Sequence, residues 1–210
     1  MKKLIITILA LVPLTLWAQD NTWERIETEE EEQQEETKKQ KVNPDAKYLR
    51  GAVPVVDGRV LFSKHIDAPG KSADQVFDIL QKYMSKMTRE KNQLGNSKLV
   101  SEDRAKHSLV GVYEEWLVFK ASALVLDRTR LYYVVKADCK DGGADVIITN
   151  IRYLYEEERD PQRYSAEEWI TDKEAVNKKN TKLLSTTGKF RRKTIDRKDF
   201  LFNKFESLLK

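Results

Sequence analysis

The chain has 210 residues and one cysteine, Cys139, so an intramolecular disulfide framework is excluded. Its formal net charge of +4 hides an asymmetry, because residues 19–46 hold ten acids and four bases whereas residues 47–210 hold 24 acids and 32 bases. A mildly basic domain behind an acidic leader favours anionic partners, but a charge of this size says more about solubility than about a ligand.

The first 18 residues have the pattern of a cleavable signal peptide. Lys2 and Lys3 precede an apolar run from Leu4 to Leu16, and Ala18 supplies a small residue at the cut point. The run is shorter than the roughly 20 residues that span a bilayer. We therefore expect a periplasmic or secreted protein that starts at Gln19 and has no transmembrane segment after cleavage.

Residues 19–46 are acidic and rich in glutamine, with the run Glu29–Glu36 followed by three lysines within four residues. They offer almost no apolar side chains to bury, which is typical of a disordered tether. Asn43-Pro44 marks the end of this segment. One folded domain is expected over residues 47–210, which is long enough to bury a core.

The folded part is predicted to open with a hairpin or an entry strand over residues 53–66. Asp57-Gly58 lies between two apolar stretches, and residues 60–66 have strand character. Pro69-Gly70 then breaks the chain, and Ser72 is a good N-cap for an amphipathic helix. The predicted core positions of that helix are Val76, Phe77, Ile79, Leu80, Tyr83, Met84 and Met87.

Four strands and then helices are predicted after Gly95. The strand-like runs are residues 98–102, 109–119, 123–138 and 144–155. Asp141-Gly142 indicates a tight hairpin between the last two, so the strands are expected to pair as an antiparallel meander.

The C-terminal third is predicted to be helical. Ser165 and Thr171, each followed three residues later by a glutamate, fit capping boxes of two short helices. A longer helix is expected over residues 193–208, after Gly188.

This order predicts an α+β fold, an antiparallel sheet of about five strands with helices on one face. Two architectures fit the order: the half-unit of the TATA-binding-protein fold and the helix-grip fold of lipid-carrying domains. The helix-grip fold usually has more strands, so the first is favoured.

Several stretches resemble a family of exported gut-bacterial proteins with an uncharacterised domain of TATA-binding-protein-like fold. The matching stretches are residues 51–58, 114–119, 126–130, 152–159, 167–172 and 188–196. The resemblance covers nearly all of residues 48–205 and implies a fold and a compartment. The family has no established activity, so no catalytic residue is carried over.

The sequence holds no catalytic or metal-binding constellation. His65 and His107 stand without ligand motifs, so no metal and no cofactor are predicted. Cys139 lies between Lys136 and Lys140, which would lower a thiol pKa, but no base accompanies it. A half-buried structural side chain is the favoured interpretation, and the protein is predicted not to be an enzyme.

One surface is singled out as a speculative binding site, made of Trp116, Arg152, Tyr153, Tyr155, Arg191 and Arg192. Alternation along a strand puts Tyr153 and Tyr155 on one side and Arg152 on the other, and ordinary core or rim packing is the favoured explanation of that pattern. The acidic cluster 156–160 is expected to pair internally with residues 191–193, although exposed ion pairs stabilise little.

Three functions are compatible with the sequence. The leading one is a non-enzymatic interaction module that contacts an envelope or secreted protein. The alternative is a carrier of a lipid or other apolar small molecule, which requires a cavity of a few hundred Å³ between sheet and helices. A hydrolase would require convergent titratable groups in a cleft. Nucleic acid is not expected as a partner, because export removes the protein from cytoplasmic DNA and a fold alone does not carry function.

Overall fold

The computed structural model describes residues 43–122 and 125–210. The predicted signal peptide and residues 19–42 of the predicted tether therefore lie outside the described residues. Within residues 43–46, Asp45 accepts a hydrogen bond from the Leu183 backbone N–H at 3.0 Å and pairs with Arg192 at 2.6 Å. Contacts with the domain thus begin before Lys47.

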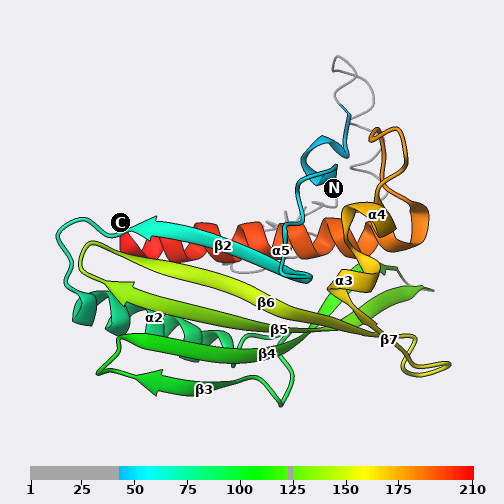
Figure 1. The fold of residues 1–210 in the computed structure, drawn as a ribbon. Helices are drawn as coiled ribbons and strands as arrows, with labels where there is room; N and C mark the ends of the chain where they lie inside the picture. Colours follow the sequence, from blue (N-terminus) through cyan, green and yellow to red (C-terminus); the bar gives the residue numbers. More distant parts are fainter. Residues whose placement is uncertain (1–42, 123–124) are drawn as a thin grey trace, which may run out of the picture.

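Seven antiparallel strands form one sheet in the order β1-β2-β6-β5-β4-β3, and β7 pairs with β6 (Figure 1). The strands are β1 (Val55–Val56), β2 (Arg59–Asp67), β3 (Lys98–Asp103), β4 (Ser108–Ala121), β5 (Leu126–Lys140), β6 (Gly143–Tyr155) and β7 (Gln162–Ser165). The predicted α+β class is confirmed. The strand count exceeds the predicted five because β1 and β7, with two and four residues, are too short to show a period.

Both predicted Asp-Gly turns are present. Asp57 and Gly58 have φ of 51° and 75°, the left-handed pair that a type I′ turn needs between β1 and β2. Asp141 and Gly142 connect β5 to β6, where Lys140 pairs with Gly143.

Two long helices pack on one face of the sheet, behind it in the view of Figure 1. They are α2 (Ala73–Met87) and α5 (Ser185–Leu209). Shorter elements are η1 (Ala46–Tyr48), α3 (Ala166–Trp169) and α4 (Asp172–Ala175). Ser72 caps α2 in a capping box with Gln75, so the predicted start of this helix is confirmed.

The C-terminal helices differ from the prediction at two points. The capping box of Ser165 and Glu168 is confirmed, but Thr171 makes no cap bond and its hydroxyl instead donates to the Glu167 carbonyl at 3.3 Å. The long helix begins at Ser185, eight residues before the predicted start. Gly188 does not end a segment; a Cβ there would lie 2.6 Å from Leu183 Cβ, so glycine permits close packing inside the helix.

The core between α5 and the sheet is tightly packed. A gap of about 10 Å³ remains there, lined by side chains that include Leu131, Ile148 and Leu201. That volume is about the space of one water molecule. The carrier alternative requires a cavity of a few hundred Å³ at this place, so the packing gives it no support.

A bulge in β6 reverses the alternation of its side chains. Val146 and Ile148 are buried in the core, yet beyond Asn150 the buried positions are Ile151 and Tyr153. Asn150 has φ of 54°, and the pairing with β5 shifts by one residue at this point.

Candidate functional site

One face of the sheet carries no described helix and is called the open face. It is the front of the molecule in Figure 1, with α2 and α5 behind it. Its side chains alternate along each strand with those of the core, so the strand register places them in rows across the sheet.

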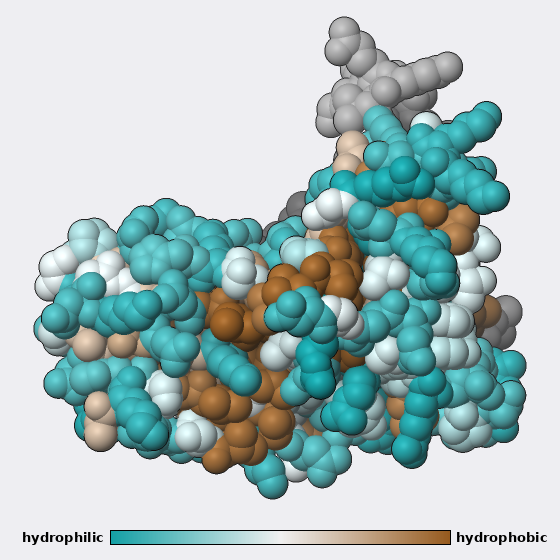
Figure 2. All heavy atoms as spheres, viewed as in Figure 1, coloured by the Kyte–Doolittle hydropathy of each residue, from teal (hydrophilic) through white to brown (hydrophobic). Residues whose placement is uncertain are grey.

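An apolar row crosses the middle of the open face. Val112 on β4 lies opposite Val134 on β5, and Val134 lies opposite Thr149 on β6. Thr149 in turn faces Leu61 on β2. Two further half-buried apolar side chains, Val110 and Ile147, lie in the adjacent row. Figure 2 shows hydrophobic residues gathered in a band that runs across this face from β2 to β3.

Arginines and aromatic side chains occupy the rows next to the apolar row. Trp116 on β4 lies opposite Arg130 on β5, which faces Leu154 on β6. The Arg128 guanidinium stacks over the Trp116 ring, 3.7 Å from its centroid. Arg128 also pairs with Glu158 at 3.2 Å.

Two carboxylates hold Arg130 in place. Arg130 donates hydrogen bonds to the Glu157 carboxylate through two of its nitrogens and to the Glu114 carboxylate at 2.8 Å. The bonds to Glu157 and Glu114 raise the pKa of the Arg130 guanidinium. Burial of Glu114 works to raise its carboxyl pKa, but hydrogen bonds from Arg130 and Asn96 outweigh it and hold that pKa below its ordinary value.

The predicted ion pairs between the acidic cluster and residues 191–193 are wrong in their partners. Glu157 and Glu158 pair with Arg130 and Arg128 of β5. Leu154 and Tyr155 at the end of β6 pair with Arg130 and Thr129 of β5, so the turn that follows β6 lies beside these arginines.

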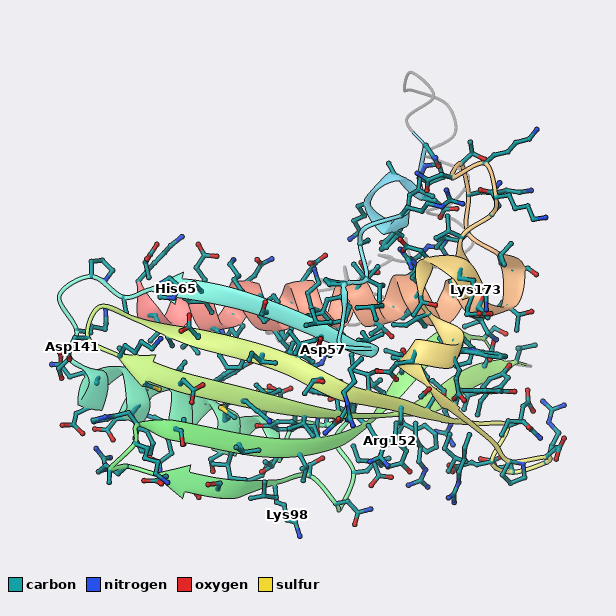
Figure 3. All side chains as sticks on the ribbon, viewed as in Figure 1. Asp57, His65, Lys98, Asp141, Arg152 and Lys173 are labelled. Carbon is teal, nitrogen blue, oxygen red and sulfur yellow. The ribbon has the colours of Figure 1, made fainter. Side chains whose placement is uncertain are left out.

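Beside these rows lies a hollow of about 420 Å³, which we call the arginine hollow. The side chains that define it are Tyr132, Arg152, Leu154, Arg163, Ser165 and Glu168. Arg152 lies 6.0 Å from the centroid of the Tyr132 ring. Figure 3 shows Arg152 on the open face, near β7. A smaller hollow of about 110 Å³ adjoins Trp116 and Arg128.

Two of the six predicted binding residues, Trp116 and Arg152, lie on the open face. Tyr153 and Tyr155 point to the other side of the sheet. Tyr153 is 1% exposed and its hydroxyl shares a hydrogen bond of 2.7 Å with Thr194. The Tyr155 hydroxyl donates to Asp127 at 3.0 Å and accepts from Lys189.

The predicted residues of α5 also lie away from the open face. Arg191 is fully buried and donates to the carbonyls of Tyr48, Leu49 and Ile170. Arg192 pairs with Asp45. Both arginines attach neighbouring segments to the helix, so the six residues do not form one surface.

Of the six residues named above for the arginine hollow, sequence reasoning included only Arg152 in the predicted binding site. Tyr132 carries no local sign beyond strand character, and Arg163 lies on β7, whose four residues give no strand signal. Pro161 followed by Gln-Arg-Tyr-Ser is the one local hint of a short edge strand there.

A buried ion pair was also missed. Glu115 and Arg197 are 0% and 2% exposed and bond through two contacts of 2.7 and 2.8 Å. Asn92 and Gln93 donate to the same carboxylate. This group lies in the core under the helices, where a substrate has no access, so its role is structural.

The environment of Cys139 is not that of a reactive thiol. Burial raises the pKa of the Cys139 thiol to about 12, with the Asp138 charge adding to the effect, which is the opposite of an activated thiol. Within residues 43–122 and 125–210, no cluster of three or more histidine, cysteine or acidic side chains is arranged to hold a metal ion. No helix in the same ranges is long and apolar enough to cross a membrane.

Comparisons with known proteins agree with this fold. Residues 62–154 match a family described as a domain of unknown function (DUF4468) with TBP-like fold. The crystal structure of a DUF4468 family protein from Bacteroides ovatus is 44% identical, with a TM-score of 0.74; the match covers 82% of this chain and 96% of that one. A TBP-like protein from Parabacteroides distasonis is 17% identical, with a TM-score of 0.63, over 75% and 96% of the two chains. Among curated proteins, none matches.

Proposed function

This chain belongs to the DUF4468 family of TBP-like fold, and we propose that it is a non-enzymatic binding module that contacts a protein partner through the open face of its sheet. We place its work outside the cytoplasm, in the periplasm or beyond, on the basis of the signal-peptide pattern in residues 1–18.

The observation that carries the proposal is the apolar row on an uncovered sheet face. Val134 and Val112 are half-buried although no described helix lies over them, whereas Val135, which points to the other side, is fully buried. A contiguous apolar patch bordered by polar side chains is typical of a protein-binding surface.

The charge next to the row indicates the chemistry of the partner. Lys98 lies opposite Val112, and Lys136 lies opposite Val110. Both lysine side chains are exposed. A partner that presents apolar side chains flanked by acidic ones fits this arrangement, because opposite charges at the rim speed association and fix orientation.

The test is partner capture by the full chain from envelope extracts of the source cells, followed by purification of the captured protein and direct binding. Val134→Asp places a charge in the row and is expected to weaken binding at least tenfold. Lys82→Asp changes an exposed residue on α2, on the opposite side, and is the control. Equal binding by the Val134→Asp variant and the wild type would remove the open face as the site, and a lack of any reproducible partner would remove the proposed function.

Export has its own test. We expect the protein recovered from the periplasm or medium to start at Gln19 when its N-terminus is sequenced. Recovery of the uncut chain in the cytoplasm alone would contradict the proposed location.

A further inference from the structure

The arginine hollow contains two arginines that no described carboxylate neutralises. Arg152 on β6 pairs in register with Ser165 on β7, and Leu154 pairs with Arg163. The two arginines are therefore diagonal neighbours on the same face, roughly 7–8 Å apart at the backbone. Both are exposed and both line the hollow.

The two arginines of the neighbouring strand β5 differ from this pair. Arg130 is held by Glu114 and Glu157, and Arg128 is held by Glu158. The arginines of β5 are thus paired with carboxylates, whereas no ion pair is formed by Arg152 on β6 or Arg163 on β7 with the described residues.

The carboxylate that does line the hollow is already occupied. Glu168 accepts hydrogen bonds from the Ser165 hydroxyl at 2.7 Å and from its backbone N–H at 3.1 Å. These bonds lower the pKa of the Glu168 carboxyl and fix it in the capping box of α3. The described residues that line the hollow therefore carry two positive charges, on Arg152 and Arg163, and one negative charge, on Glu168. The Glu168 carboxylate is already hydrogen-bonded to Ser165.

The size and walls of the hollow describe the rest of the ligand. Its volume of about 420 Å³ falls within the usual range of small-molecule sites, about 300–1,000 Å³. The ring of Tyr132 and the side chain of Leu154 form apolar walls next to the guanidinium groups. Such walls are suited to a flat organic ring whose charged group faces the arginines.

We propose that the arginine hollow binds a phosphate monoester carried on a small ring-shaped organic molecule. Each guanidinium offers a planar fork of N–H donors that matches two oxygens of an anion. One fork satisfies a carboxylate, whereas the three terminal oxygens and double charge of a phosphate monoester can engage both arginines. The inference rests on the proposed function in one respect: it gives the open face a second, small-molecule contact beside the apolar row.

Phenyl phosphate is the probe, measured against the full chain by calorimetry at low salt, with inorganic phosphate and benzoate as comparisons. We expect saturable binding of phenyl phosphate that is at least tenfold tighter than that of either comparison, because only this probe offers both the ring and the phosphate. Arg152→Ala and Arg163→Ala are each expected to weaken it at least tenfold. Arg163→Lys should bind with intermediate affinity, because an ammonium group lacks the bidentate fork.

Arg89→Ala is the matched control, since Arg89 is an exposed arginine just after α2 and outside the hollow. Its affinity should equal that of the wild type, and unchanged thermal midpoints would show that all variants are folded. No saturable binding, wild-type affinity in both alanine variants, or benzoate binding as tightly as phenyl phosphate would each overturn the proposal. Equal affinity for inorganic phosphate would assign the site to the free ion and overturn the organic part.

The two proposals fail separately. If the wild type does not bind phenyl phosphate but Val134→Asp still weakens binding of the protein partner, the proposed function stands and the small-molecule site does not. The reverse pattern would leave a small-molecule site without a protein partner.

Discussion

Removing Arg197 should destabilise the domain strongly, because it leaves the Glu115 carboxylate buried without its cation. Glu115 is fully buried and Arg197 reaches it through two short hydrogen bonds. Breaking such a pair from one side costs about 3–5 kcal/mol. For a domain of this size, about 2–4 °C of melting temperature is lost per kcal/mol, so Arg197→Met should melt roughly 6–20 °C below the wild type.

The double variant Glu115→Leu, Arg197→Met separates a pairing effect from simple loss of packing. Replacing both charges by apolar groups of similar volume is often close to neutral, so the double variant should recover most of the stability lost in Arg197→Met. Chemical unfolding in urea, analysed as a two-state transition, measures both free energies of unfolding.

The pH dependence gives a second readout. Burial raises the pKa of Glu115, and loss of Arg197 removes the main influence that opposes this rise. A carboxyl whose folded pKa lies above its unfolded value favours the native state at low pH and loses that contribution as pH rises through the folded pKa. The destabilisation of Arg197→Met should therefore be smaller at pH 5 than at pH 8. Equal stability of the single and double variants, or a cost below about 1 kcal/mol, would refute the argument.

Two further predictions concern single side chains. Cys139 is 5% exposed and its thiol pKa is raised to about 12, so a thiol reagent at pH 8 should label it only in denaturant; rapid labelling of the native protein would show that the strand end opens readily. Gly188→Ala should lower the free energy of unfolding by about 1–3 kcal/mol despite the better helix propensity of alanine, because the new Cβ meets Leu183 at 2.6 Å. Thr186→Ala, at an exposed position in the first turn of the same helix, is the control in the same urea titration, and equal stability of the two variants would contradict the packing argument.

Local signals in the sequence were enough for most of the fold. The Ser72 cap with its apolar spacing, the Asp57-Gly58 turn and the Asp141-Gly142 turn each act within a few residues, and all three are present in the structure. The α+β order followed from them, whereas the TBP-like family was indicated by the resemblance of separate stretches of the sequence. Such signals are readable because the chemistry that fixes them lies within one turn of chain.

The candidate site was harder to predict because its members meet through strand register. Tyr132, Arg152 and Arg163 come from three strands, and β7 is too short to give a strand pattern in the sequence. Arg191 looked like a surface cation in sequence, yet its donors are used by backbone carbonyls of two other segments. A lone charged residue carries no sign of whether its partners are solvent or distant backbone.

The bulge at Asn150 decides which chemistry the sheet displays. If β6 kept its strict alternation, Tyr153 would continue on the displayed side and Arg152 would be directed into the core. One inserted residue thus exchanges an aromatic surface for a cationic one without changing the identity of any side chain. The bulge thus determines which side chains of β6 lie on the open face.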